Sequence, residues 1–337
     1  MEDRKVLTIA SHVCVVSGYV GNSVTTFVLQ LMGLDVASLN TVQFSNHAGY
    51  RRLKGFRTTA GQISDLYDGL KGCGLDDFGM LLTGYIPSEE CVEAVGRIAG
   101  DMKGKEGGCF WLLDPVMGDQ DRLYVSEGVL PVYKSLVRMA DLIVPNQFEA
   151  ELLSGVKVDS LPSLSRAISE LHRIYNVPHV VITSVTFTNG DKKMLCAGSS
   201  ATSSGVPRKF VFNVEIIDGF FSGTGDMFAA LTLARFREEA EKDGLEVAQS
   251  WGCDDAVGPL ELPLCRAIGR VLGSMHLVLV QTQLARDKVL GTKKREEEVE
   301  VGSEEYIRLT KASELRLVQC QSELKDPEIG YEAVVLK

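Results

Sequence analysis

Phe220-Phe221-Ser222-Gly223-Thr224-Gly225-Asp226 leads directly into residues 227–235, a run of good helix formers. Two glycines around a threonine allow a tight turn and the close approach of another group. The following helix begins with unpaired N–H groups and the positive end of its dipole, which together favour an anion such as a transferring phosphate. Asp226 at the mouth of that pocket can accept the hydroxyl proton in a phosphoryl transfer. The alternative is a carboxylate that only caps a helix after a glycine turn.

The composition is that of a globular protein and argues against two classes of partner. Charged residues make up 24% of the 337 positions and the hydrophobic set makes up 45%. The formal net charge of −10 argues against non-specific binding to nucleic acid or to anionic membranes. We expect no transmembrane helix and no signal peptide. The eight cysteines show no C-x-x-C spacing, so we expect reduced thiols, a cytoplasmic protein and no zinc site.

Short apolar runs alternate with helical stripes along the whole chain. Strands are expected at residues 6–10, 37–44, 78–83, 110–113, 142–144, 180–182, 194–197, 210–214 and 315–318, the last at a sheet edge. Helices are expected at about 23–32, 63–70, 88–102, 164–175, 264–279 and after Asn146 and Gly225. Charged segments at about 237–260 and 287–304 are expected to be solvated surface insertions. The alternation predicts one domain over 1–337, a three-layer αβα sandwich with a mostly parallel central sheet.

Polar residues follow the ends of the predicted parallel strands. In such sheets ligands bind beyond the carboxyl ends of the strands, so these residues should share one rim. They are Ser11, Tyr85, Asp114, Asn146, Thr183 and the glycine turn. Neither the P-loop pattern nor the G-x-G-x-x-G dinucleotide pattern is present, so neither explains them.

Each polar motif has a functional and a structural interpretation. Asp114 and Asp119 lie on a Pro/Gly-rich loop after a strand, where their carboxylates could bind Mg²⁺ or simply be solvated. Glu149 could do metal-linked work or only stabilise the start of a helix. Tyr85 could stack on an aromatic substrate or pack at the rim. His12 and His47 could be ligands, but hydrogen-bonding loop residues are the favoured interpretation.

Taken together and in order, these motifs resemble the pyridoxal kinase family of the ribokinase-like superfamily. The matching blocks are Ser11-His12-Val13, Gly18-Tyr19-Val20-Gly21-Asn22, Val42-Gln43-Phe44-Ser45-Asn46-His47, Leu82-Thr83-Gly84-Tyr85, Asp114-Pro115-Val116-Met117-Gly118-Asp119, Pro145-Asn146-Gln147-Phe148-Glu149-Ala150-Glu151-Leu152, Gly223-Thr224-Gly225-Asp226 and Asp326-Pro327-Glu328-Ile329. Many small-molecule kinases share Gly-Thr-Gly-Asp, whereas the Ser-Asn-His and Asn-Gln-Phe-Glu blocks are more specific to this family. The resemblance covers the chain except residues 189–209, 237–260 and 287–304.

The resemblance implies ATP-dependent phosphorylation of the 5′-hydroxyl of pyridoxal, pyridoxine and pyridoxamine by a homodimer. Asp226 would be the base, and the turn from Gly223 to Gly225 would hold the γ-phosphate. The substrate would lie near Ser11, Ala48, Tyr85, Tyr124, Gly223 and Asp226. ATP would lie near Asp114, Asn146, Gln147, Phe148, Glu149, Thr183, Ser184, Ile217, Asp218, Gly219, Thr224 and Gly225.

The resemblance also implies cations and a flap. Asp114, Asp119 and Glu149 would organise Mg²⁺ and a monovalent cation such as K⁺ around the ATP phosphates. The loop 118–124, which ends in Tyr124, would shield those phosphates from water.

Three positions depart from the family pattern. Ala48 replaces a threonine that would contact the substrate ring, and Val144 replaces a threonine near the monovalent cation. The loop 14–17 is about two residues longer than in the family. A kinase of another hydroxymethyl heterocycle, such as hydroxymethylpyrimidine, and an inactive homologue that only binds vitamin B6 or nucleotide therefore remain alternatives.

Overall fold

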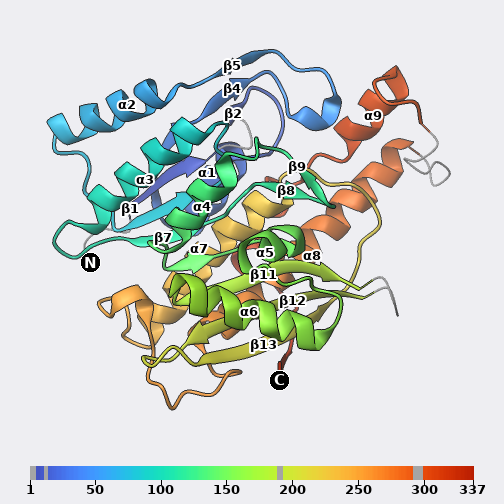
Figure 1. Ribbon diagram of the computed structural model, residues 1–337. Helices are drawn as coiled ribbons and strands as arrows, with labels where there is room; N and C mark the ends of the chain where they lie inside the picture. Colours follow the sequence, from blue (N-terminus) through green and yellow to red (C-terminus); the bar gives the residue numbers. More distant parts are fainter. Residues whose placement is uncertain (1–4, 11–13, 188–192, 291–298) are drawn as a thin grey trace.

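A single mixed sheet runs through the centre of the computed structural model, which describes residues 5–10, 14–187, 193–290 and 299–337 (Figure 1). In these residues its strands are β1 (Lys5–Ala10), β3 (Asp35–Asn40), β6 (Met80–Thr83), β7 (Phe110–Leu113), β10 (Leu142–Ile143), β11 (His179–Thr186), β12 (Met194–Ala201), β13 (Pro207–Val214) and β14 (Ala333–Val335). The spatial order is β14-β13-β12-β11-β10-β7-β6-β1-β3. All pairings from β3 to β11 are parallel, whereas β12, β13 and β14 pair antiparallel.

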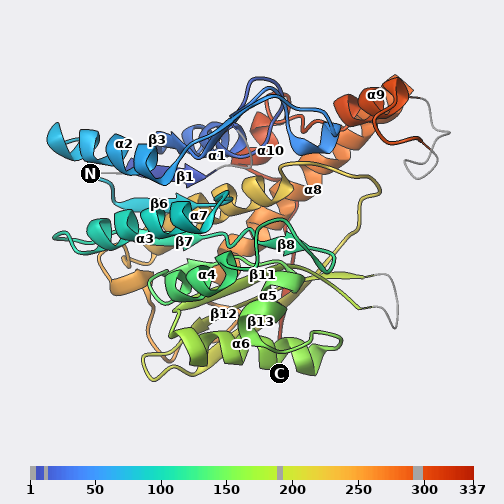
Figure 2. The same ribbon diagram turned by 45° about the horizontal axis from the view of Figure 1, so that its top comes forward.

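Helices cover both faces of this sheet. One face carries α2 (Ala60–Gly72), α3 (Glu89–Lys103), α4 (Val129–Val137), α5 (Gln147–Ser154) and α6 (Leu161–Tyr175). The other face carries α1 (Asn22–Leu31), α7 (Thr224–Lys242), α8 (Pro263–Leu290) and the short α10 (Gln321–Lys325). The green helices α4, α5 and α6 lie in front of the sheet in Figure 1, and Figure 2 separates the layers further. The predicted three-layer αβα fold is confirmed.

The central strands bury both of their faces, which is why they are apolar throughout. In β6, Met80 and Leu82 pack with α7 and α8, whereas Leu81 packs with the helices of the opposite layer. In β7, Phe110 likewise packs with the α7 and α8 layer, whereas Trp111 packs with the opposite layer. This alternation follows from the two-residue period of a strand.

Two strand predictions are wrong. Residues 315–318 form no strand, because Leu315 and Leu317 both pack into the core beside α8 and the hydroxyl of Thr282 accepts the N–H of Arg316. The strand at that sheet edge is β14. The strand predicted at 37–44 is two strands, β3 and β4 (Val42–Phe44), which belong to different sheets.

The charged segments that follow α7 and α8 are partly built into the helices. α7 continues to Lys242, and the short η2 (Gln249–Trp251) places the Trp251 ring on Phe110 with 3.6 Å between ring centroids. α8 continues to Leu290, and α9 (Glu304–Ala312) begins at the end of the second segment. Residues 291–298, in the middle of the predicted 287–304 insertion, lie outside the described part of the chain.

α8 is the one helix of the described residues that is long and apolar enough to cross a membrane. Of its most apolar window, 61% is buried inside the structure, where α8 packs against α7, β12 and β13. Burial of this kind is also typical of a core helix in a folded domain.

Candidate active site

The glycine turn lies where two helices begin. Gly223 is the N-cap of α7 and has φ +84°, and a Cβ atom there would clash with the carbonyl oxygen of Tyr19. Gly21, with φ +54°, is the N-cap of α1. The loop of residues 19–21 therefore packs directly on the glycine turn. The first turns of α1 and α7 meet here, so the positive ends of both helix dipoles point to this place.

Asp226 lies in the first turn of α7 and is only 6% exposed. Its Oδ2 accepts the backbone N–H of Gly21 at 2.8 Å, which holds the carboxylate against the loop before α1. The N-cap position itself belongs to Gly223, which has no side chain to cap the helix. Asp226 thus joins two segments across the rim, which is more than a helix cap requires.

Backbone hydrogen bonds join the ends of neighbouring strands into a continuous rim. The N–H groups of Gly84, Asp114, Val144 and Thr183 donate to the carbonyl oxygens of Ile9, Thr83, Leu113 and Pro145, at 2.9–3.3 Å. The rim positions that the sequence singles out in the described residues, Tyr85, Asp114, Asn146 and Thr183, are therefore adjacent. Ser11 lies outside the described residues.

Three acidic side chains at this rim, Asp114, Glu149 and Asp226, are close enough for their charges to interact. Asp114 is 9% exposed, and burial raises the pKa of its carboxyl well above the usual range, with further contributions from the charges of Glu149 and Asp226. Burial also raises the pKa of Glu149 to about 8, although three backbone N–H groups act in the opposite direction. Buried carboxylates that repel one another are the environment that a cation would stabilise.

Glu149 and Asn146 tie the loop after β7 to the start of α5. Glu149 Oε1 accepts the N–H groups of Met117 (2.7 Å) and Gly118 (3.3 Å), and Oε2 accepts that of Asn146 (3.0 Å). Asn146 Oδ1 accepts the N–H of Glu149, and its Nδ2 donates to the carbonyl of Gly118 at 2.8 Å. Both side chains therefore position the loop that carries Asp114 and Asp119.

Gln147 and Phe148 support the same region from behind. Gln147 Oε1 accepts the N–H of Thr186 at 2.9 Å, and its Nε2 donates to the carbonyl of Val158 at 2.7 Å. The Phe148 ring lies so close to Gly118 that a Cβ there would be 2.8 Å from it. The Gln147 amide is thus bonded to backbone groups on both sides, a supporting role that the sequence did not predict.

The loop 118–124 forms a β-hairpin made of β8 (Gly118–Asp119) and β9 (Arg122–Leu123). Gln120 and Asp121 both have positive φ, as a two-residue hairpin turn requires. Asp119 is exposed, and its Oδ1 accepts the N–H of Gln120. The N–H of Tyr124 donates to the carbonyl oxygen of Met117 at the base of the hairpin. Tyr124 as a whole is 55% exposed. This hairpin has the shape expected of a flap over the rim.

Of the residues predicted to face the nucleotide, the segment 217–219 lies next to α8. Thr183 and Ser184 sit at a β-bulge in β11 and are half-buried. Residues 217–219 form a largely exposed segment between β13 and α7. Gln283 of α8 donates from Nε2 to the carbonyl of Asp218 at 3.1 Å, so α8 supports this segment.

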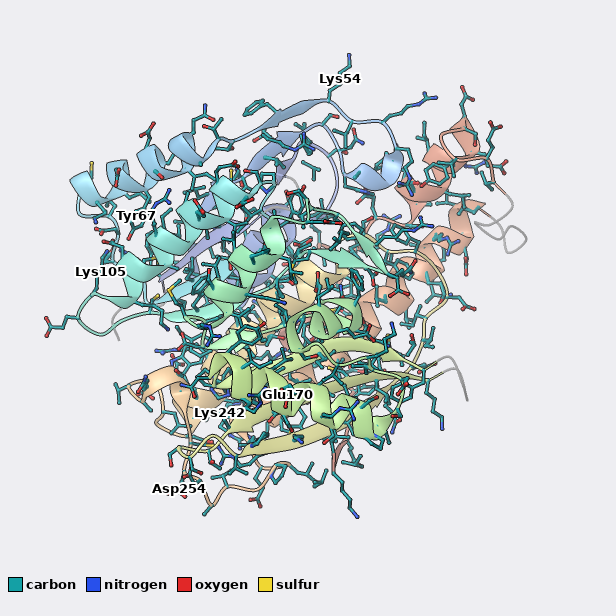
Figure 3. The ribbon with its side chains drawn as sticks, viewed as in Figure 1. Lys54, Tyr67, Lys105, Glu170, Lys242 and Asp254 are labelled. Carbon is teal, nitrogen blue, oxygen red and sulfur yellow. The ribbon has the colours of Figure 1, made fainter. Side chains whose placement is uncertain are left out.

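Ala48, one of the residues predicted to face the substrate, follows a strand of a small second sheet. In the described residues this sheet consists of β2 (Cys14–Val15), β4 and β5 (Gly55–Arg57), and Lys54 between β4 and β5 points away from the molecule (Figure 3). Ala48 is exposed in the short helix η1 (Ala48–Tyr50). A Cβ on Gly49 would lie 3.3 Å from the hydroxyl of Ser222, so η1 borders the glycine turn.

In the described residues no three His, Cys, Asp or Glu side chains form a ready-made metal cage, and the thiols of Cys73, Cys91, Cys109, Cys196, Cys253, Cys265 and Cys320 are free. The carboxylates of Asp114 and Glu149 still fit a hard cation that keeps waters and phosphate oxygens as its other ligands. Sequence reasoning missed two residues that bear on the site. Gly21 stood within a matching block, and Glu314 follows α9, far along the chain from every motif.

The fold and the glycine turn define a ribokinase-like small-molecule kinase. Human pyridoxal kinase is 34% identical to this chain over 346 residues, which cover 99% of each protein, and sheep pyridoxal kinase is 35% identical with the same coverage. The chain belongs to the pyridoxal kinase family. The family predicted from the sequence motifs is confirmed.

A solved structure and a family model agree with this assignment. The pyridoxal kinase of Leishmania donovani in complex with ADP and pyridoxine matches with a TM-score of 0.79 and 29% identity, and covers 100% of both chains. A family model described as phosphomethylpyrimidine kinase matches residues 76–251. This segment runs from just before β6 to η2 and includes the glycine turn.

Proposed function

We propose that this chain is a pyridoxal kinase that transfers the γ-phosphate of ATP to the 5′-hydroxymethyl group of pyridoxal, pyridoxine and pyridoxamine. The product from pyridoxal is pyridoxal 5′-phosphate, which is the outcome of vitamin B6 salvage. The family supports this activity, and structures of the Leishmania donovani enzyme contain ADP with pyridoxine and with pyridoxamine. The observation that carries the proposal is the Asp226 carboxylate, held by Gly21 at the shared start of α1 and α7.

We propose a separate task for each side of the rim. Asp226 accepts the proton of the 5′-hydroxyl as that oxygen attacks phosphorus. The N–H groups of the turn from Gly223 to Gly225 and the two helix dipoles stabilise the transferring phosphoryl group. Ser11, Ala48 and Tyr85 border the pyridine ring, and the 118–124 hairpin closes over the phosphates.

We propose that the other residues predicted to bind ATP divide into two groups. One group lines the nucleotide, and the other holds the backbone of the loop that carries Asp114. Thr183, Ser184 and the segment of Ile217, Asp218 and Gly219 line the nucleotide side. Asn146, Gln147, Phe148 and Glu149 hold the loop that carries Asp114. The hydrogen bonds that occupy the Asn146, Gln147 and Glu149 side chains support this division.

We propose that Mg²⁺ binds beside Asp114, with Asp119 on the hairpin and Glu149 behind the loop, and that a monovalent cation such as K⁺ binds nearby. Cations of this kind neutralise phosphate charge when bound. The raised pKa values of Asp114 and Glu149 support the proposal, because a nearby cation would offset the cost that burial imposes on their negative charges.

We further propose a cytoplasmic homodimer in which residues 1–337 form a single kinase domain. One continuous sheet that contains both Lys5 and Val335 supports the single domain. The family resemblance supports the dimer and the scattered cysteines support the compartment, and light scattering of the purified protein would measure the oligomeric state.

Single-turnover phosphorylation of pyridoxal by wild type and Asp226→Asn tests the proposal. Removal of the base should lower kcat about 10²–10⁴-fold. Affinity for pyridoxal and ATP should change little, because the base acts in the transition state. The melting temperature should also stay close to that of wild type, since asparagine keeps an oxygen that can accept the N–H of Gly21. Near-normal turnover in a well-folded variant would remove Asp226 from the mechanism.

A hydroxymethylpyrimidine kinase is the second candidate, because the matching family model carries a phosphomethylpyrimidine kinase description. A panel of pyridoxal, pyridoxine, pyridoxamine and hydroxymethylpyrimidine separates the two. Turnover of the pyrimidine without turnover of pyridoxal would establish the second candidate. Binding of pyridoxal and ATP without any turnover would instead identify an inactive homologue.

A further inference from the structure

Glu314 joins two segments on the substrate side of the rim. It lies just beyond α9, and its side chain is 18% exposed. Glu314 Oε1 lies 3.0 Å from His47 Nε2 and accepts the hydroxyl of Tyr50 at 3.0 Å. Its Oε2 accepts the backbone N–H of Tyr19 at 3.2 Å. One carboxylate therefore holds both the loop before α1 and the helix η1.

The surroundings of Glu314 are shaped for a carboxylate. Gly18 has φ +113°, and a Cβ there would lie 2.9 Å from Glu314 Oε1, so the glycine leaves room for the acid. His47 Nδ1 accepts the N–H of Gly49 at 3.2 Å, which places the ring proton on Nε2. All three partners of Glu314 are then donors. Burial alone would raise the pKa of Glu314, but the hydrogen bonds from His47, Tyr19 and Tyr50 lower it below its usual value.

Each segment that Glu314 holds continues directly to the reaction site. Two residues beyond Tyr19, the N–H of Gly21 binds the Asp226 carboxylate. The carbonyl of Tyr19 packs on Gly223 of the phosphate turn. On the other side, His47 is the N-cap of η1, which carries Ala48 and borders Ser222. The carboxylate of Glu314 thus fixes the loop of the base relative to the wall of the substrate pocket.

We propose that Glu314 is a positioning residue of the kinase reaction, which sets the separation between η1 and the 19–21 loop and so aligns the substrate hydroxyl with Asp226. It touches none of the reacting atoms. The proposal rests on the proposed phosphorylation of pyridoxal and adds a residue that no sequence motif pointed to.

The competing interpretation is that Glu314 only anchors the end of α9. Glu314 also borders a cavity of about 870 Å³ that Arg52, Lys311 and Arg316 help to line and that includes no residue of the glycine turn in its lining. Water in this cavity would solvate the carboxylate in either role, so kinetic measurements distinguish an anchor from a positioning group. An anchor would change stability without changing the kinetic constants for one substrate in particular.

Steady-state kinetics of Glu314→Gln separate these interpretations. Glutamine keeps the shape but turns an NH₂ group toward one of three donors, so η1 and the 19–21 loop should move apart. We expect kcat/KM for pyridoxal to fall about 10-fold to 100-fold, as misplacement by about 1 Å can do. The KM for ATP should stay within about twofold of wild type. Tyr50→Phe, which removes one of the three contacts, should shift the same constant in the same direction by less.

Glu304→Gln is the matched control, because Glu304 is an exposed acid on α9 that none of these contacts involves. It should leave both kinetic constants unchanged. A Glu314→Gln enzyme with a lowered melting temperature and wild-type kcat/KM for pyridoxal would overturn the proposal, as would an equal change in the KM for ATP. If wild type phosphorylates hydroxymethylpyrimidine but not pyridoxal, the proposed function fails. The kinetics of wild type and Glu314→Gln with hydroxymethylpyrimidine then decide the role of Glu314. If wild type phosphorylates none, both proposals fall.

Discussion

Asp226 and Glu149 occupy the same position in their helices, yet the structure separates their roles. Glu149 is the third residue of α5 and forms a reciprocal capping box with Asn146. Asp226 is the third residue of α7, where the N-cap Gly223 has no side chain. Both acids also bind backbone N–H groups of a distant loop, Glu149 at Met117 and Asp226 at Gly21. Sequence spacing could reveal the helix starts but not these long-range partners.

Restoring Ala48→Thr should tighten pyridoxal binding and leave ATP binding nearly unchanged. Ala48 is exposed in η1 beside the glycine turn, so a hydroxyl fits without disturbing the core. The expected gain is that of one hydrogen bond, about 0.5–1.5 kcal/mol. Calorimetric titration of both ligands measures it. No gain for pyridoxal would mean that the longer 14–17 loop has rebuilt the pocket.

Asp119→Asn and Glu149→Gln should differ in how far cations restore activity. Asp119 is exposed, so its loss should raise the Mg²⁺ requirement, and excess Mg²⁺ or K⁺ should recover much of the rate. Glu149→Gln also turns an NH₂ group toward backbone donors, so it should lower the free energy of unfolding by about 1–3 kcal/mol and recover less. Rate measured against Mg²⁺ concentration, together with thermal melting, tests both. Equal and complete rescue would show that Glu149 acts only through the cation.

Elements with a complete local signal could be predicted, and elements defined by a distant partner could not. Ser88 caps α3 as its sequence indicates, and the stripe of α6 lies buried. The residues 42–44 look like a continuation of β3, but they leave the main sheet because β2 and β5 pair with them. The alternation of apolar and polar residues at 315–318 is typical of a strand, but here it arises because Leu315 and Leu317 both pack into the core beside α8. The hydrophobic pattern of a short segment does not show which distant strand will pair with it.

The two glycines of the turn should respond differently to alanine. Gly223→Ala would place a Cβ against the Tyr19 carbonyl at a positive φ, so it should cost about 1–3 kcal/mol of stability and displace the 19–21 loop. Gly225→Ala is the matched control, because no atom lies within 4 Å of its would-be Cβ. It should leave stability unchanged or raise it by up to about 1 kcal/mol. Urea unfolding compares them, and similar losses would contradict the steric argument.

At the scale of the whole molecule, the end of the sheet opposite the active site is held by a buried polar network. His179 of β11 binds the hydroxyl of Ser200 through Nδ1 and the carbonyl of Ser250 through Nε2, both at 2.8 Å. Ser250 in turn donates to Asp141, which also accepts the N–H of Trp111. Part of the charged 237–260 segment is thereby fixed to the core.

Stability should therefore depend on the protonation of His179. Burial lowers its pKa to about 4, from 6.5 in the unfolded chain. Between these values the unfolded chain binds the proton and the folded protein does not, so this contribution is complete above pH 6.5 and lost as the pH falls toward 4. The stability advantage of wild type over His179→Gln should shrink by about 2 kcal/mol between pH 7 and pH 5. Urea unfolding at the two pH values measures it, and an advantage independent of pH would contradict this assignment.

The antiparallel margin of the sheet has a consequence for biosynthesis. β13 is complete at Val214, but β14, which pairs with its outer edge, does not appear in the chain until Ala333. At translation rates of about 5–20 residues per second, β13 emerges well before its partner and presents unpaired N–H and carbonyl groups meanwhile. Nascent chains on crowded ribosomes could pair through that open edge. A chaperone that shields residues 207–214 during this interval would therefore raise the yield of native protein. Its effect on the folding rate of the rest of the chain would be smaller.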